Sequence, residues 1–140
     1  MIAYTSIYGN TRKAALLLAK TLEAKGQKVT IHDLARCDMH EAVEDAFRYG
    51  KLVLATSTYN GDVFPFMKEY IHHLTERNFQ NRTIGLMENG SWAPVAAKVM
   101  EKMLENSKNL TFTDTTVKIF SAMDEENVAQ IEAMAEELCR

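Results

Sequence analysis

The sequence predicts a three-layer α/β fold, in which helices cover both faces of an open, doubly wound parallel sheet. Five segments with strand-like apolar patterns alternate along the chain with five helical segments. In the helical segments, apolar residues recur every three or four positions. Strands that alternate with helices pair in parallel through right-handed crossovers, which places helices on both sides of one sheet. The length of 140 residues corresponds to about one domain, so we expect a single domain over residues 1–140.

The strands are predicted from short apolar or alternating runs. Residues 2–4 form an apolar run that a turn at Gly9 interrupts, and residues 29–31 alternate with polar neighbours, as on an edge strand. Residues 51–56 indicate a buried strand, and residues 84–87 predict the fourth strand. Residues 116–120 alternate again and predict the last strand.

The helices are predicted from apolar residues spaced three and four positions apart. The first helix follows the turn at Gly9 and stops at Gly26, which is a common helix terminator. The residues expected on the buried faces of the five helices, in chain order, are Ala14, Ala15, Leu18 and Leu22; Ala42, Val43, Ala46 and Phe47; Met67, Tyr70, Ile71 and Leu74; Val95, Val99, Met103 and Leu104; and Val128, Ile131, Ala135 and Leu138.

Composition excludes several classes of protein. A net charge of −3 is too balanced for a nucleic-acid-binding surface. No apolar run reaches the roughly 20 residues that cross a bilayer, and no signal peptide pattern begins the chain, so we expect a cytoplasmic protein without a membrane partner. Cys37 and Cys139 form no CxxC pair, which fits reduced thiols. The four histidines have no accompanying carboxylate cluster, so we expect no metal site.

The loop after the first strand has the chemistry of an anion site. Parallel sheets bind ligands at the carboxyl ends of their strands, where the strand order reverses. The loop from Thr5 to Thr11 enters a helix N-terminus, where free N–H groups and the helix dipole favour a phosphate. Ser6, Asn10 and Thr11 can donate further hydrogen bonds, although plain helix capping by these residues is the alternative. The patterns GxxxxGK[ST] and GxGxxG are absent, which excludes the common nucleotide loops that carry them.

The loops after the third and fourth strands each carry one aromatic residue among small polar residues. An aromatic at a loop tip exposes apolar area without a folding gain, so two of them beside a phosphate site indicate two plates around a flat heteroaromatic ring. The alternative is one buried Trp and one surface Tyr. The two loops contain Ser57, Thr58, Tyr59, Asn60 and Gly61, and Asn89, Gly90, Ser91 and Trp92.

These loops resemble those of the flavodoxin family, and the resemblance extends from Ile2 to Leu138. The stretch Thr5–Thr11 is similar to the family's FMN phosphate loop, and the loops around Tyr59 and Trp92 resemble the two loops that flank the flavin ring. The resemblance implies a flavodoxin-like five-stranded sheet of order 2-1-3-4-5 and FMN as the cofactor. The cofactor-binding residues that it implies are Ser6, Ile7, Tyr8, Gly9, Asn10, Thr11, Ser57, Thr58, Tyr59, Asn60, Gly61, Asn89, Gly90, Ser91 and Trp92.

In detail, the chain is most similar to the flavodoxin-like domain of flavodiiron proteins, and an uninterrupted last strand resembles the short-chain flavodoxins. Three features depart from free flavodoxins. The chain is only mildly acidic, with Arg12 and Lys13 directly after the phosphate loop. Asn60 replaces the glycine usual at its turn. The first strand is short, with about four residues where five or six are typical, which suggests a domain cut from a longer protein with a di-iron domain upstream.

Two function classes compete, together with a binding module that has no cofactor. The first is an FMN-dependent electron carrier that shuttles electrons between redox partner proteins, such as a reductase or a di-iron domain. The second is an FMN-dependent oxidoreductase of the same fold, of the quinone reductase or porphyrinogen oxidase type. Tyr59 and Trp92 covering both ring faces favour the carrier, because an enzyme needs a substrate pocket over one face. The carrier requires no catalytic side chain.

Overall fold

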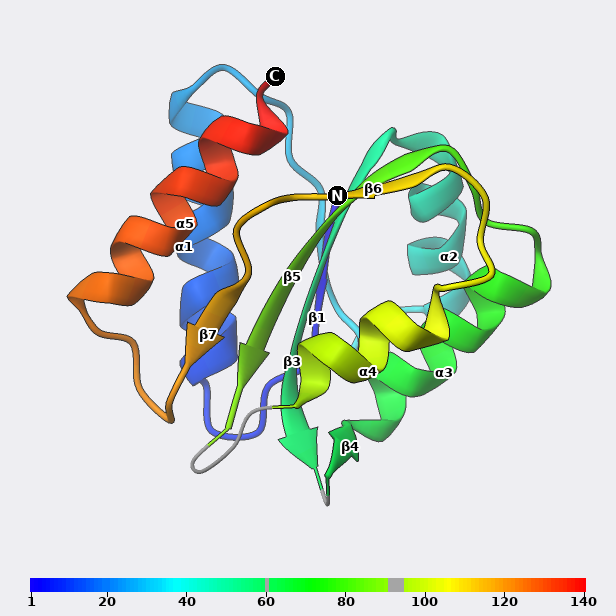
Figure 1. The fold of residues 1–140 in the computed structure, drawn as a ribbon, viewed down its shortest axis with the longest axis horizontal. Helices are drawn as coiled ribbons and strands as arrows, with labels where there is room; N and C mark the ends of the chain where they lie inside the picture. The colour runs from blue at the N-terminus through cyan, green and yellow to red at the C-terminus, as the bar shows by residue number, and fades with distance from the viewer. Residues whose placement is uncertain (60, 91–94) are drawn as a thin grey trace.

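The computed structural model describes residues 1–59, 61–90 and 95–140, and it confirms the predicted three-layer α/β fold (Figure 1). Two helices cover one face of a central sheet and three cover the other. No helix in these three ranges is long and apolar enough to cross a membrane. The first face carries α1 (Asn10–Ala24) and α5 (Glu125–Leu138), and the second carries α2 (Met39–Arg48), α3 (Pro65–Glu76) and α4 (Ala96–Met103).

Local signals set the helix boundaries. Gly26 has a φ of 86° just after α1, a left-handed conformation that a glycine adopts without strain. The Asp38 carboxylate accepts a hydrogen bond from the His40 N–H at 2.9 Å and caps the start of α2. Pro65 is the first residue of α3, a position where its missing N–H costs no hydrogen bond.

The parallel sheet has the order β2-β1-β3-β5-β6. β1 (Ile2–Tyr4) lies between β2 (Ile31–Asp33) and β3 (Lys51–Tyr59), and β5 (Arg82–Asn89) pairs with the other side of β3. β5 is the fourth predicted strand, and β7 (Val117–Ile119), which covers the fifth, pairs with β5 on the side away from β3, so the predicted order 2-1-3-4-5 is confirmed. The chain adds β2 on one side of β1 and β3 on the other, so the strand order reverses at β1.

The strand beside β5 differs from the prediction of one uninterrupted strand. It consists of β6 (Leu110–Phe112) and β7 (Val117–Ile119), which both pair in parallel with β5. Between these segments, residues 113–116 lie opposite only residues 85–86 of β5, so the strand bulges by two residues. The prediction of a strand at 116–120 covers β7 and misses β6, which has only three residues.

A short antiparallel hairpin extends β3 beyond its predicted end at Thr56. β4 (Asp62–Val63) pairs with the last residues of β3, so that Thr58 lies opposite Val63. Gly61 has a φ of 74° in the turn between them. β4 and the end of β3 therefore extend beyond the edge of the parallel sheet (Figure 1).

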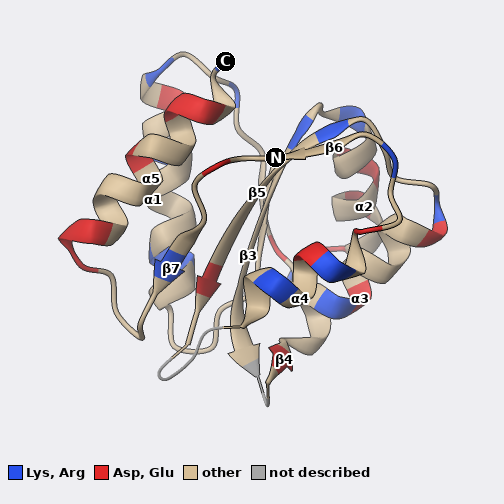
Figure 2. Ribbon diagram, in the orientation of Figure 1, with Lys and Arg blue, Asp and Glu red and all other residues tan. Residues whose placement is uncertain are grey.

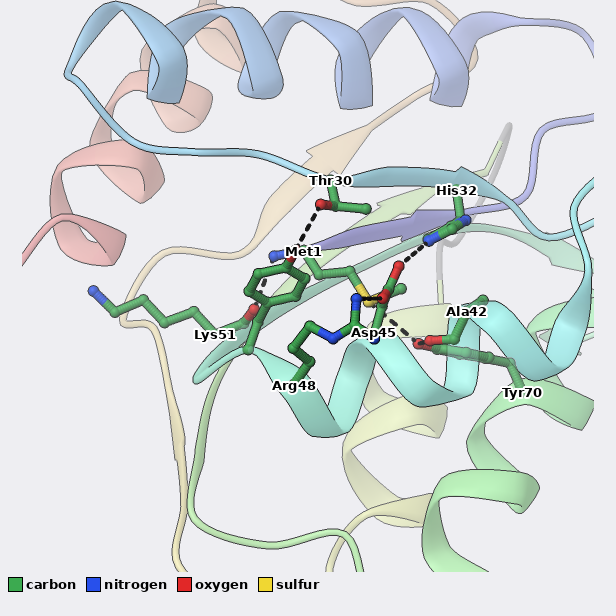
Figure 3. A network of polar contacts seen from close by, with 9 residues as sticks. Met1, Thr30, His32, Ala42, Asp45, Arg48, Lys51 and Tyr70 are labelled. Carbon is green, nitrogen blue, oxygen red and sulfur yellow. Dashed lines mark hydrogen bonds and ion pairs between the residues drawn. The ribbon is translucent and has the colours of Figure 1, made fainter.

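Side chains alternate along the strands and create two separate cores. Ala3, Leu54 and Ile84 face the layer of α2, α3 and α4, whereas Ile2 and Val53 face α1 and α5. The polar network in Figure 3 joins β2 to α2. Its centre is the carboxylate of the buried Asp45, which lies 2.7 Å from Nε2 of His32 and 3.3 Å from a guanidinium nitrogen of Arg48.

Helix α5 corrects one predicted core position. Val128, expected on the buried face, is 38% exposed, and the neighbouring Asn127 is buried instead. Asn127 accepts a hydrogen bond from the Asp124 N–H at 3.1 Å and donates one to the Lys118 carbonyl at 2.6 Å. A polar side chain replaces an apolar one here because its hydrogen bonds fix the start of α5 against β7.

Candidate functional site

The loop after β1 leads into the N-terminus of α1, which lies at the carboxyl edge of the sheet and has free N–H groups. Gly9 has a φ of 86° and turns the chain into α1. The Ser6 hydroxyl accepts hydrogen bonds from the N–H groups of Gly9 at 3.0 Å and Arg12 at 3.3 Å. Within the described residues, the N–H groups of Asn10 and Thr11 have no hydrogen-bond partner. Two backbone donors at the positive end of the helix dipole therefore remain available to an anion.

One cavity brings the three predicted loops together. Its volume is about 160 Å³, and it lies where the strand order reverses. Every lining residue except Ser121 belongs to the set predicted from the sequence. The lining residues are Ser6, Ile7, Tyr8, Asn10, Thr11, Ser57, Thr58, Asn89, Gly90 and Ser121.

Hydroxyl groups join the first loop to the end of β3. The hydroxyls of Thr11 and Ser57 lie 3.3 Å apart, and those of the buried residues Thr5 and Thr56 lie 2.6 Å apart. The Thr58 hydroxyl accepts a hydrogen bond from the Val95 N–H at 3.1 Å, at the start of α4. These contacts hold the first and second loops in register at the cavity.

Ser121 is a cavity residue that the sequence prediction missed. It follows β7 and has a φ of 70°, which is unusual for a residue with a Cβ atom. Its N–H donates to the Asn89 Oδ1 atom at 2.9 Å, and its carbonyl accepts from Asn89 Nδ2 at 3.0 Å. The one sequence signal for Ser121 is its place after the last strand, because every strand of a parallel sheet ends at the same edge.

Four of the predicted residues cannot be placed fully. Asn60, Ser91 and Trp92 lie outside the described residues, and the side chain of Tyr59 is not described. The pair of rings that would flank a flavin therefore stays a prediction. Gly9 and Gly61 are described and have left-handed conformations, and the Gly90 N–H donates to the Ile119 carbonyl at 3.1 Å.

The electrostatics of the cavity favour an anionic ligand. Its lining contains no Asp or Glu among the described residues. Glu88 is buried at the carboxyl end of β5, and its carboxylate accepts a hydrogen bond from the Ala97 N–H at 3.1 Å. Burial raises the pKa of Glu88, and this hydrogen bond and the charges of Lys118 and Lys98 oppose the rise. The residues present therefore suit a phosphate at the first loop, and they fit FMN.

A larger hollow, of about 590 Å³, lies at the opposite end of the molecule. It is lined by residues near the ends of α3 and α4, including His72, Asn78 and Lys108. Both of these helices end there, so neither offers free N–H groups to a ligand. No group of three or more His, Cys, Asp or Glu residues that could hold a metal is found in the described part of the chain.

Known proteins share this fold and sequence pattern. A family model described as a flavodoxin domain matches residues 1–137. The anaerobic nitric oxide reductase flavorubredoxin of Escherichia coli is 24% identical over 108 residues, which are 76% of this chain and 22% of the relative. This chain thus spans about a fifth of that protein.

Two solved structures illustrate the structural likeness. Rubredoxin oxygen:oxidoreductase from Desulfovibrio gigas has a TM-score of 0.92 and 21% identity, over 99% of this chain and 34% of that protein. A flavodoxin from Streptococcus pneumoniae has a TM-score of 0.84 and 22% identity, over 99% of this chain and 95% of that protein. The fold, the family model and the cavity agree. The chain therefore belongs to the flavodoxin domain family, whose members are FMN-binding flavoproteins of electron transport.

Proposed function

We propose that residues 1–140 form one FMN-binding domain that carries electrons between partner proteins. The cavity at the reversal of the strand order supports this proposal most directly, because it combines an open helix N-terminus with residues from three loops. FMN, when bound, supplies the redox chemistry, and the protein supplies binding, orientation and electrostatics. We place the carrier in the cytoplasm, where the free thiols of Cys37 and Cys139 are stable.

The first loop is the proposed binding site for the phosphate. A phosphate dianion needs several hydrogen-bond donors because it carries three acceptor oxygens. The N–H groups of Asn10 and Thr11 and the hydroxyls of Ser6 and Thr11 can supply them. No positively charged side chain lines the cavity among the described residues, so the charge of the phosphate is balanced by the helix dipole and by hydrogen bonds.

The remaining predicted residues are the proposed binding site for the ring. Tyr59 and Trp92 flank its two faces in this proposal, and the turn at Gly61 and the segment from Asn89 to Ser91 contact its edges. The described part of the cavity contains no histidine or carboxylate that could act as a general acid or base. An electron carrier requires neither group, so this chemistry favours the carrier over an oxidoreductase with its own substrate.

The similar proteins support a partner on the same chain or a neighbouring one. A structure named as a flavodiiron core from Synechocystis has a TM-score of 0.83 to this chain, which covers 34% of it. We propose that electrons pass between this domain and a redox partner such as a di-iron domain or a reductase.

Titration of the FMN-free protein with FMN tests the proposal. Trp92 is the one tryptophan of the chain, so stacking on the ring should quench its fluorescence as FMN binds. Riboflavin, which lacks the phosphate, should bind much more weakly, and FAD should bind poorly because its second phosphate has no matching donors. Equal affinity for FAD and FMN contradicts the phosphate site. Steady-state turnover of NAD(P)H with a quinone contradicts the carrier and favours the oxidoreductase.

A further inference from the structure

Helix α4 begins without a capping side chain of its own. Its N-cap residue is Val95, whose side chain has no hydrogen-bond acceptor, and its first turn contains no acidic residue. Two strands supply acceptors instead. The Glu88 carboxylate on β5 accepts a hydrogen bond from the Ala97 N–H at 3.1 Å, and the Thr58 hydroxyl on β3 accepts one from the Val95 N–H at 3.1 Å. Side chains from β3 and β5 therefore fix the start of α4.

Both of these side chains belong to the edge of the sheet that carries the cavity. Thr58 lines the cavity, and Glu88 directly precedes Asn89, which also lines it. The chain leaves β5 at Asn89 and enters α4 at Ala96. The hydrogen bond between Glu88 and Ala97 therefore joins the two ends of the connection that contains the third predicted loop.

Glu88 lies in a buried polar row one residue below the cavity. Thr5, Thr56 and Glu88 are all buried. Thr56 lies opposite Glu88 in the pairing of β3 with β5, and the hydroxyls of Thr5 and Thr56 lie 2.6 Å apart. Polar groups in a buried layer need partners, so they restrain their neighbours. The residues that directly follow these three along the chain all line the cavity, and they are Ser6, Ser57 and Asn89.

The carboxylate of Glu88 has charged neighbours that suit its burial. Figure 2 shows the acidic residue of β5 near the carboxyl end of that strand, beside the basic residue of β7. These are Glu88 and Lys118, which the strand pairing places opposite each other. Lys118 and Lys98, in the first turn of α4, both oppose the rise in pKa that burial causes at Glu88. An apolar side chain in place of Glu88 would leave the Ala97 N–H without this acceptor.

We propose that Glu88 is a positioning residue for the flavin ring, because it holds the start of α4 and thereby the spacing of the second and third predicted loops. The proposal rests on the proposed function, which places the ring between these loops. Glu88 does not line the described part of the cavity, so it acts through α4. The phosphate loop leads into α1 on the opposite face of the sheet, so the effect of Glu88 should be confined to the ring.

Two ligands separate the ring from the phosphate. Riboflavin has the ring and lacks the phosphate, so a change that acts on the ring alone should weaken riboflavin and FMN by the same factor. We expect Glu88→Ala to weaken both at least about fivefold. Glu88→Gln, whose amide oxygen can still accept the Ala97 N–H, should stay within about twofold of the wild type. Titration of the FMN-free full chain, followed by flavin fluorescence, measures these affinities.

Glu88→Asp separates the charge from the hydrogen bond. It keeps the carboxylate, but its side chain is one methylene group shorter and should not reach the Ala97 N–H. We expect it to weaken both ligands as Glu88→Ala does, and it supplies the test if Glu88→Ala does not fold. Equal affinities in Glu88→Asp and the wild type overturn the proposal.

Glu137→Ala is the matched control. Glu137 also accepts a backbone N–H, from Thr115 at 3.2 Å, but it joins α5 to the segment between β6 and β7. We expect it to leave both affinities within about twofold of the wild type, because distant sites act independently. A loss as large as that of Glu88→Ala would mean that general destabilisation causes both, and it overturns the proposal.

Amide hydrogen exchange of the FMN-free chain tests the positioning without a ligand. Glu88→Ala should accelerate exchange at residues 95–99 several-fold, whereas Glu88→Gln and Glu137→Ala should not. Unchanged exchange there in Glu88→Ala, or a loss of affinity for FMN without one for riboflavin, overturns the proposal. If the wild type binds neither ligand, the proposed function fails and the role of Glu88 with it. If the wild type binds both and Glu88→Ala binds them equally well, only the role of Glu88 fails.

Discussion

The side chain of Asn89 holds the backbone of Ser121 through two hydrogen bonds, one in each direction. Asn89 ends β5, whereas Ser121 follows β7, so this contact fixes the segment after the last strand against the neighbouring strand. Ser121 has a left-handed backbone, which needs such support. Asn89, from the third predicted loop, therefore positions Ser121, the cavity residue that follows β7.

Replacing Asn89 by Leu should release this segment. The two lost hydrogen bonds should lower the free energy of unfolding by about 1–3 kcal/mol and weaken FMN binding as well. Asn89→Asp keeps the acceptor for the Ser121 N–H and should have an intermediate effect on stability. Urea unfolding and FMN titration measure both quantities. Unchanged FMN affinity in Asn89→Leu would show that Ser121 lies outside the cofactor site.

Removing the Thr11 hydroxyl should weaken FMN binding by about 1.5–3 kcal/mol, if that hydroxyl bonds a charged phosphate. Thr11→Val keeps the shape of the side chain in α1. The matched control is Thr21→Val in the same helix, where the hydroxyl donates to the Leu17 carbonyl away from the cavity. FMN titration of both variants compares them. Equal losses of affinity would mean that Thr11 acts through helix stability and not through the phosphate.

The turn at Gly61 requires a left-handed residue. Gly61 has a φ of 74°, which a β-branched side chain resists at a cost of roughly 1–2 kcal/mol. Gly61→Val should therefore weaken FMN binding and shift the midpoint potential of the bound flavin. Gly61→Asn, which tolerates this conformation, should retain most of the affinity. If Gly61→Val and Gly61→Asn have the same FMN affinity and the same midpoint potential, the backbone conformation of this turn does not affect FMN binding.

Glu88 should make stability fall as the pH rises. Burial raises its pKa above the ordinary value of 4.5, so the unfolded chain loses this proton at a lower pH than the folded chain. The folded state then holds more protons over this interval, and stability declines from pH 4.5 up through the folded pKa.

Glu88→Gln cannot ionise, and its amide oxygen can still accept the Ala97 N–H. Its stability relative to the wild type should therefore increase with pH above about 4.5. Urea unfolding across a pH series measures this difference, with the exposed Glu105→Gln as the control. If the free energies of unfolding of the wild type and Glu88→Gln change with pH in the same way, the pKa of Glu88 is not raised in the folded state.

Much of the cavity could be predicted from the sequence because most of its residues have the same place in the fold. Each predicted loop follows a strand of a parallel sheet, so Ser6, Ser57 and Asn89 had to meet at one edge. The FMN phosphate loop then adds a specific motif at Ser6–Thr11. The described residues of the three loops do line one cavity. Their binding of FMN, and the ring-flanking role of Tyr59 and Trp92, stay predictions.

The features that the sequence did not predict depend on contacts between distant residues. Ser121 has no motif, and its place is set by the Asn89 side chain. Asn127 is buried because it forms hydrogen bonds with Asp124 and Lys118. The spacing of apolar residues in the sequence cannot predict the burial of such a polar residue. β6 has three residues and gains its strand geometry from pairing with β5. Local patterns cannot report such tertiary contacts.

The two-residue bulge between β6 and β7 should make this edge of the sheet a poor template for a strand from another chain. A regular edge strand offers a continuous row of N–H and C=O groups on which another chain can add a strand. Here that row is broken at residues 113–116, and the Thr115 N–H and hydroxyl donate to the Glu137 carboxylate of α5 at 3.2 and 2.7 Å. On this side of the sheet, another chain could therefore pair only with two three-residue segments, β6 and β7.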